Sequence, residues 1–297
     1  MKRKNEDLRV PYARTVYGQE EVNAVLRVLK DPGKIVAGPN VRDFEHAVAK
    51  LFGKKYGVMT NSGSSANLIA LEVLDLPPGA EVITPALTYS TTVAPIIQKG
   101  LRPIFVDVEP EKFNIDAAQV ERRITRKTKA IMVPSLVGNF PDLAELRHVA
   151  KKYKLWLIED SCDTLGGSFH GRPSGYYSDI STISFYASHI VTAAGGGGMV
   201  CFHDPHLARR AKIMANCGRE SALFGSYEQS EEIKRRFSYK MNGMPYDAKF
   251  VFSEIGYNFQ PLELSAAFGL EQLKRLPKFI RIRRRIFREL SRFFRTY

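Results

Sequence analysis

A single histidine, His189, stands where the sequence could place a base at the edge of a sheet. It follows the β-branched and aromatic run Thr182 to Tyr186 and precedes four consecutive glycines, Gly195 to Gly198. The run is typical of a buried strand, and open α/β folds bind ligands at the carboxyl ends of their strands. An imidazole there can move a proton near neutral pH. The alternative is a core histidine beside a flexible loop, so the other strand ends decide between the two.

Two further turns contain groups that suit a phosphorylated aromatic ligand. Residues 60–65, Thr-Asn-Ser-Gly-Ser-Ser, form a Gly/Ser turn that opens a predicted helix. Hydroxyls and free N–H groups at a helix N-terminus bind phosphate, although serine is also a common N-cap. Tyr89 follows the next predicted strand, where it could stack on a ring or pack in the core.

Asp160 closes the hydrophobic run Trp156-Leu-Ile-Glu-Asp. A carboxylate in that place must be paired or ligand-bound, because burial of a lone charge is costly. It could hold the proton on a heterocyclic nitrogen. A phosphate cradle, an aromatic plane, a carboxylate and a base therefore converge from four strand ends. Together they suit pyridoxal phosphate, which needs a phosphate anchor, a ring stack and a pyridinium partner.

The elements that must position these groups alternate along the chain. Apolar runs predict seven strands, at residues 56–59, 81–83, 103–108, 130–133, 155–158, 180–185 and 199–202. Helical periodicity is found at residues 18–30, 41–52, 66–74, 93–98, 117–124 and 143–153. The first helix has Val22, Val25, Leu26 and Leu29 on one face before Asp31-Pro32-Gly33 ends it. This alternation predicts an α/β fold with a mainly parallel seven-stranded sheet and helices on both faces.

Composition excludes several classes of protein. The 297 residues are 44% hydrophobic and 25% charged, as in a soluble globular protein with a sizeable core. No apolar run is long enough to cross a bilayer, and the basic start lacks the apolar segment of a secretory signal. Three cysteines, Cys162, Cys201 and Cys217, are too few for a disulfide framework or a four-thiolate metal site. We therefore expect no bound metal and a cytoplasmic location.

Most of the net charge of +13 lies in residues 271–297, where ten Lys or Arg stand against two Glu. The rest carries about +5, so we expect no nucleic acid partner. Within residues 271–297, an apolar stripe predicts a helix with an Arg-rich opposite face. The stripe consists of Phe279, Ile282, Ile286, Leu290 and Phe293. Attachment of this helix to an anionic membrane is the minority alternative.

Over nearly all of its length, the sequence resembles the DegT/DnrJ/EryC1/StrS sugar aminotransferase family of fold-type I pyridoxal-phosphate enzymes. The matching stretches include Asn61-Ser-Gly-Ser-Ser-Ala, Glu81-Val-Ile-Thr-Pro-Ala-Leu-Thr-Tyr, Ile158-Glu-Asp, Ser184-Phe-Tyr and Gly256-Tyr-Asn-Phe. The resemblance implies a cofactor-binding large domain over residues 1–270. It also implies that the basic helix, residues 271–297, leads toward a small C-terminal domain, which we expect to be missing because the chain stops at Tyr297.

The resemblance also implies which residues hold the cofactor. Those at its phosphate are Gly63, Ser64, Ser65 and Ser184. Those at its ring are Tyr89, which stacks on it, Asp160, which faces the pyridine nitrogen, and Asp163, which flanks it. Asn258 would reach the phosphate of the neighbouring subunit, so a homodimer is implied.

His189 stands where most members of the family have the lysine that binds the cofactor covalently. An imidazole has no primary amine for that bond, but it can act as a general base. The same exchange occurs in the family's sugar 3-dehydratases, such as GDP-4-keto-6-deoxymannose 3-dehydratase and an iron–sulfur relative. A cluster needs four thiolates, so we expect none here. The resemblance thus implies 3-dehydration of a nucleotide-linked 4-keto-6-deoxyhexose with pyridoxamine phosphate, His189 as base and glutamate as amino donor.

Two alternatives stay open. An aminotransferase that makes a 4-amino or 3-amino sugar would need a lysine from elsewhere, such as Lys240 or Lys249. A non-catalytic cofactor-binding paralogue or fragment is favoured by the early end of the chain. It is also favoured by Gly195, which stands where relatives often have Glu.

Overall fold

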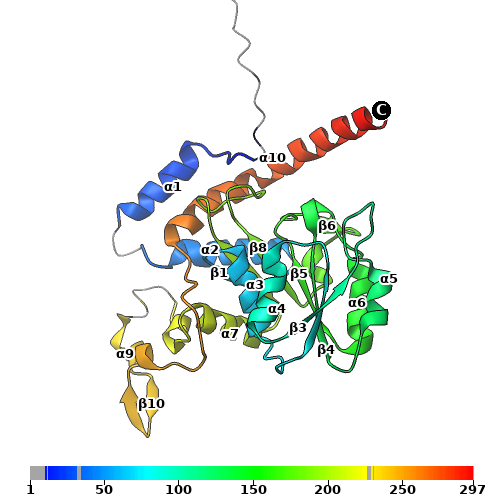
Figure 1. Ribbon diagram of the computed structural model, residues 1–297. Helices are drawn as coiled ribbons and strands as arrows, with labels where there is room; N and C mark the ends of the chain where they lie inside the picture. The colour runs from blue at the N-terminus through cyan, green and yellow to red at the C-terminus, as the bar shows by residue number, and fades with distance from the viewer. Residues whose placement is uncertain (1–10, 12, 32–34, 226–228, 230, 297) are drawn as a thin grey trace, which may run out of the picture.

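A seven-stranded sheet forms the centre of the computed structural model, which describes residues 11, 13–31, 35–225, 229 and 231–296. Its strands are β1 (Tyr56–Thr60), β2 (Glu81–Pro85), β3 (Arg102–Val106), β4 (Thr128–Pro134), β5 (Trp156–Asp160), β8 (Ile180–Ser184) and β9 (Gly198–Phe202). They lie in the order β1-β9-β8-β5-β4-β2-β3 (Figure 1). Only β9 runs against its neighbours within this sheet; the other contacts are parallel. The predicted strands and the mainly parallel sheet are confirmed.

Helices cover both faces of the sheet, as predicted. One face packs against α3 (Gly63–Glu72), α4 (Ser90–Gln98) and α7 (Pro205–Ala215). The opposite face packs against α2 (Pro39–Leu51) and α10 (Glu263–Phe294) at one end. At the other end it packs against α5 (Ala117–Val120) and α6 (Leu143–Tyr153). We call these two surfaces of the sheet the α3 face and the α2 face.

The pleat of the strands sends consecutive side chains to opposite faces. On β5, Ile158 packs in the core of the α3 face and Leu157 in that of the α2 face. Asp160 therefore lies on the α3 face and Glu159 on the α2 face. The neighbouring strand β8 pairs Thr182 with Asp160 in register. The two acids at the end of β5 thus lie in separate environments.

The outer helices differ in detail from the sequence-based expectation. In α1 (Gln19–Leu29), the small residues Ala24 and Val28 pack against Ala267 of α10. The predicted apolar face is left largely exposed, with Val22, Leu26 and Leu29 on the surface. Small side chains let the two helix backbones approach, so they decide which face is buried. The predicted stop at Pro32 and Gly33 lies outside the described residues.

Helix α10 begins at Glu263, before the predicted basic helix of residues 271–297, and continues through Pro277. Its apolar stripe is exposed at Ile282, Ile286, Leu290 and Phe293, and the helix projects from the body (Figure 1). Because α10 runs across residue 270, the predicted domain division stays a prediction. None of the helices in the described part of the chain is both long and apolar enough to cross a membrane.

Short elements complete the described chain. They include several short 3₁₀ helices, the short helix α9 (Ile233–Arg236), and two strand pairs, β6 (Ser168–Phe169) with β7 (Arg172–Pro173) and β10 (Tyr239–Met241) with β11 (Met244–Tyr246). Figure 1 shows the β10–β11 hairpin extending away from the sheet.

Candidate active site

The Gly/Ser turn before α3 is pressed against the end of β8. A Cβ added to Gly63 would lie 2.6 Å from the Cβ of Ser184, so only glycine permits this approach. The Ser62 hydroxyl caps α3 by accepting from the Ser65 N–H at 3.1 Å, which confirms the helix start expected there. The first turn of α3 and the Ser184 side chain are therefore neighbours, as a shared phosphate site requires.

The two predicted phosphate serines differ in their surroundings. The Ser65 hydroxyl is buried and donates to Asn61 Oδ1 at 2.6 Å, so it stabilises the turn itself. Ser64 is exposed on the first turn of α3. Of the two side chains, Ser64 has the more accessible hydroxyl for an anion.

Asp160 closes β5 with a carboxylate surrounded by neutral donors. Its Oδ2 accepts from Asn67 Nδ2 at 2.8 Å and from Thr92 Oγ1 at 3.0 Å, and its Oδ1 accepts from the Cys162 N–H at 3.2 Å. The residue is only 6% exposed. Among the described residues, no Lys, Arg or His lies within ion-pair distance of it. A buried carboxylate with this donor set can accept a proton-bearing ring nitrogen, so it fits a pyridine cofactor.

Asn67, Thr92 and Thr182 belong to this arrangement, and our reading of the sequence did not single them out. The Thr182 hydroxyl donates to Asn67 Oδ1 at 2.5 Å, and Asn67 Nδ2 also faces the Thr91 carbonyl at 3.2 Å. Asn67 lies one helical turn after Gly63, on the buried side of α3. That spacing was the available signal, since a polar residue on an otherwise apolar helix face needs a partner.

Tyr89 lies at the same edge of the sheet, at the N-cap of α4. Its side chain is 71% exposed, and its carbonyl accepts from the Thr92 N–H at 3.0 Å. Thr92 in turn contacts Asp160. The Tyr89 backbone is thus linked to the carboxylate site through Thr92, and its exposed ring can stack on a planar ligand.

His189 lies in the turn after β8, with Nδ1 3.3 Å from Asp163 Oδ1. Its side chain is partly exposed, and its backbone N–H donates to the Tyr186 carbonyl at 3.0 Å.

Cys162 lies between Asp160 and Asp163 in the sequence. Burial raises the pKa of the Cys162 thiol well above its usual value, and the Asp160 charge adds to that effect. Cys162 therefore stays a protonated thiol. Within the described residues, no cluster of three or more His, Cys, Asp or Glu could hold a metal ion.

Asn258 stands apart from the other predicted residues. It is exposed, it forms a bridge with Asn216, and no described contact joins it to Gly63, Ser184 or Asp160. The next residue, Phe259, accepts the N–H of Asn61 at 3.0 Å, so the segment passes the start of the Gly/Ser turn.

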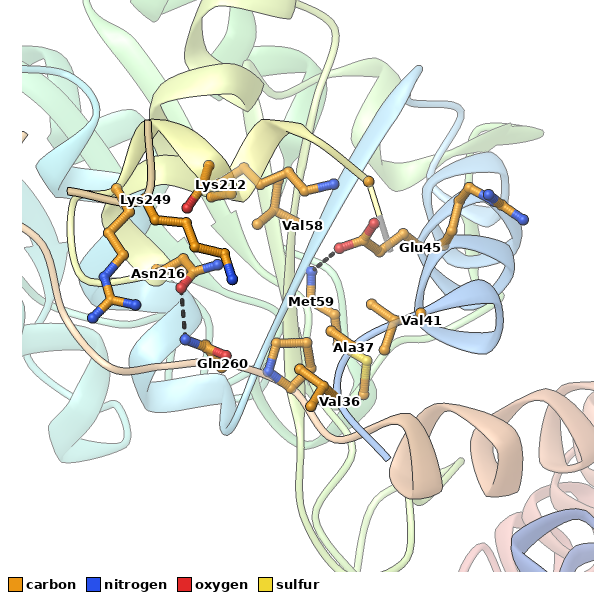
Figure 2. A pocket seen from close by; sticks show the side chains of 18 residues that line it. Val36, Ala37, Val41, Glu45, Val58, Met59, Lys212, Asn216, Lys249 and Gln260 are labelled. Carbon is orange, nitrogen blue, oxygen red and sulfur yellow. Dashed lines mark hydrogen bonds between the residues drawn. The ribbon is translucent and has the colours of Figure 1, made fainter. Parts of the chain in front are cut away.

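A cavity of about 300 Å³ opens on the outer side of the edge strand β1 (Figure 2). Val41, Val58 and Met59 form part of its apolar wall. The Glu45 carboxylate accepts the Met59 N–H at 2.8 Å, and burial raises its pKa. None of the predicted site residues lines this cavity. The candidate active site is therefore defined by converging side chains at the strand ends.

The chain has the fold of fold-type I pyridoxal-phosphate enzymes, with a mainly parallel seven-stranded sheet and the buried Asp160 at the end of the central strand β5. The chain belongs to the DegT/DnrJ/EryC1/StrS aminotransferase family, whose sequence profile matches residues 16–297. The predicted fold class and family are both confirmed.

This chain is similar to a protein named for lipopolysaccharide biosynthesis and to two solved structures of sugar dehydratases. "Lipopolysaccharide biosynthesis protein RfbH" of Salmonella typhimurium is 38% identical over 95% of this chain and 66% of that protein. A GDP-4-keto-6-deoxymannose-3-dehydratase (ColD) His-to-Asn mutant with bound GDP-perosamine has a TM-score of 0.86 and 30% identity, over 97% and 74% of the two chains. The structure of the E. coli GDP-4-keto-6-deoxy-D-mannose-3-dehydratase with bound hydrated PLP has a TM-score of 0.82 and 31% identity, over 93% of this chain and 70% of that chain. The chain thus spans about two thirds of the length of RfbH.

Proposed function

We propose that this protein is a pyridoxal- or pyridoxamine-phosphate-dependent enzyme that removes the 3-hydroxyl of a nucleotide-linked 4-keto-6-deoxyhexose. The observation that supports this function is His189, which stands in the turn after β8 where the family's lysine is expected. The dehydratase names of similar proteins support the same reaction. The structure also gives the lysine alternatives little support: Lys249 pairs with Glu231, and Lys240 lies on the exposed β10 strand. Neither has a described contact with Asp160, Ser184 or His189.

The cofactor would lie across the ends of β5, β8 and the first turn of α3. Gly63, Ser64 and Ser184 would hold its phosphate, with Ser65 stabilising the turn, and Tyr89 would stack on the ring. Asp160 would hold the proton on the ring nitrogen, and Asp163 would flank the ring. When bound as pyridoxamine phosphate, the cofactor supplies an amine for the keto group and a ring that absorbs electrons.

His189 would act as the general base. With a proton on Nδ1 directed at Asp163, the Nε2 atom is left with a free lone pair. Asp163 then fixes the ring in one orientation and stabilises the imidazolium after it accepts a proton. Partial exposure lets His189 exchange that proton with solvent between turnovers.

The same proposal includes an oligomeric state, an amino donor and a cellular location. Asn258 is exposed and so available to a second subunit, which supports a homodimer whose sites include a residue from each copy. Glutamate is the proposed amino donor that restores the amine of the cofactor. We also propose a cytoplasmic location, because a thiol such as Cys201, buried and unpaired, is typical of a reducing compartment.

The test is incubation of the protein with pyridoxamine phosphate and a panel of nucleotide-linked 4-keto-6-deoxyhexoses, with mass spectrometry of the products. We expect a 3-deoxy product and no lysine–cofactor adduct after borohydride reduction and peptide mapping. His189→Asn should bind the cofactor and lose about 10²- to 10⁴-fold in rate. An amino-sugar product, or a trapped lysine, would favour the aminotransferase alternative. Cofactor binding without any product would favour the non-catalytic alternative.

A further inference from the structure

We propose that Asn67 and Thr92 are positioning residues that select which oxygen of Asp160 meets the cofactor ring; this inference rests on the proposed function. Both residues donate to the same atom, Asp160 Oδ2, at 2.8 and 3.0 Å. A carboxylate oxygen has two lone pairs, so Oδ2 is fully occupied. Among the described hydrogen bonds, Oδ1 accepts one, from the Cys162 N–H at 3.2 Å, and the nearby Cys162 thiol is only a weak donor. Oδ1 is therefore the oxygen with an acceptor position left for a ring N–H.

The orientation of the Asn67 amide is fixed by its own partners. Its Nδ2 faces two groups that only accept hydrogen bonds, Asp160 Oδ2 and the Thr91 carbonyl, while the Thr182 hydroxyl donates to its Oδ1 at 2.5 Å. Asn67 is 1% exposed, and Thr92 and Thr182 are fully buried. A flip of the amide would turn its oxygen toward these two acceptors and break both hydrogen bonds, without water to replace them. The donor to Asp160 is thus held in place before any ligand arrives.

Thr92 connects the carboxylate to the residue proposed to stack on the ring. Its hydroxyl contacts Asp160, and its backbone N–H donates to the Tyr89 carbonyl at the start of α4. The three donors to Asp160 come from α3, α4 and the turn after β5, which lie together in Figure 1. A single oxygen therefore ties two helices to the central strand and links Asp160 to the Tyr89 backbone through Thr92.

Neutral donors serve this purpose better than a cation would. A lysine or arginine beside Asp160 would neutralise the carboxylate and compete with the ring nitrogen for it. Amide and hydroxyl donors stabilise the negative charge of Asp160 without neutralising it, so the carboxylate can still pair with a protonated ring nitrogen. Without one of them, the carboxylate is less well stabilised as an anion and takes the ring proton for itself.

The experiment compares PLP binding by wild type, Thr92→Val, Asn67→Leu and the conservative Thr92→Ser, followed by absorbance and fluorescence titration. Loss of a hydrogen bond to a charged group should weaken PLP binding roughly 10- to 100-fold in Thr92→Val and Asn67→Leu. The absorption spectrum of bound PLP should shift as well, because the proton moves from the ring nitrogen to the carboxyl. Thr92→Ser keeps the hydroxyl and should restore both the affinity and the spectrum.

Thr84→Val is the matched control. Thr84 is also fully buried, on β2, but its hydroxyl has no hydrogen-bond partner among the described atoms, so the variant should bind PLP as wild type does. Thermal unfolding of each variant shows whether the fold as a whole is lost. A local effect requires that Thr92→Ser recover the wild-type spectrum and that Thr92→Val keep a melting temperature similar to that of Thr92→Ser. Unchanged affinity and spectrum in Thr92→Val, with wild type binding PLP, would overturn this inference alone. Failure of wild type to bind PLP would instead overturn the proposed function.

Discussion

Glu159 and Asp160 are consecutive buried acids on β5 that have opposite surroundings. Asp160, on the α3 face, accepts three hydrogen bonds from neutral donors. Glu159, on the α2 face, accepts from the Ser174 hydroxyl at 3.1 Å, while its Oε2 has no partner among the described atoms. Burial raises the pKa of Glu159, and the nearby Lys54 charge opposes that effect. The surroundings of Asp160 stabilise a carboxylate anion, whereas burial makes the ionised form of Glu159 unfavourable.

Lys54 completes the contrast, because it gives the α2 face an internal cation. Its ammonium donates to the carbonyls of Ser178 at 2.6 Å and Asp179 at 3.2 Å. Glu159 and Lys54 can balance each other's charge inside the protein, so that face needs no ligand. Asp160 has no such cation among the described residues. Burial therefore does not distinguish the two acids; their neutral donors and the neighbouring cation do.

The largest expected effect separates the two acids directly. Asp160→Asn should lower dehydration activity by roughly 10³-fold or more, about 4 kcal/mol in transition-state stabilisation, because the ring nitrogen loses its anionic partner. Glu159→Gln, one residue away and equally buried, should change activity less than about threefold. Rates with pyridoxamine phosphate, measured alongside circular dichroism, check this. Equal losses in both variants would remove the distinction between the faces.

A second effect concerns the pH dependence of the α2 face. Burial lowers the pKa of Lys54 to about 8, although the neighbouring Glu159 charge opposes the shift. In an unfolded chain the lysine titrates near pH 10.4, so between about pH 8 and 10.4 only the unfolded chain holds the proton. The free energy of unfolding contributed by this group therefore increases with pH in that window, by up to about 3 kcal/mol.

Urea unfolding of wild type and Lys54→Met at pH 7.5 and pH 10 measures that contribution. The difference in unfolding free energy, wild type minus variant, should rise by about 2 kcal/mol between the two pH values. Lys55 is the exposed neighbour, and the unfolding free energy of Lys55→Met should change with pH as that of wild type does. A parallel curve for Lys54→Met would mean that the buried ammonium is not destabilised as inferred.

The smallest expected effect tests how tightly the α3 face is built. Gly63→Ala should destabilise the fold by about 1–3 kcal/mol and weaken PLP binding, because the new methyl meets Ser184 at 2.6 Å. Gly196→Ala is the control, since its Cβ would lie 3.8 Å from the nearest atom, the Asn61 carbonyl oxygen. That variant should stay within about 0.5 kcal/mol of wild type. Thermal unfolding with and without PLP measures both, and equal shifts would argue against the close contact at Ser184.

Local patterns in the sequence were enough to predict the sheet. The β-branched runs that end at Asp160 and Ser184, and the amphipathic segments between the strands, are signals carried by neighbouring residues. The Gly/Ser turn, Asp160 and His189 were recognisable for the same reason, since each lies at the end of an apolar strand or in the turn that follows it. The continuous helix from Glu263 was harder to predict, because Pro277 and the polar residues before it resemble an interruption.

The donors around Asp160 were decided only by the tertiary structure. Asn67 and Thr92 come from two helices and donate to one carboxylate, while Thr182 on β8 donates to Asn67. They come together because β5 and β8 pair in register and α3 and α4 pack on the same face. The same holds for α1, where Ala24 and Val28 displaced a more apolar face from the helix contact. A sequence specifies which side chains are polar or small. Which of them share a hydrogen bond or a close contact depends on distances across the fold, and those are set only when the sheet and its helices pack together.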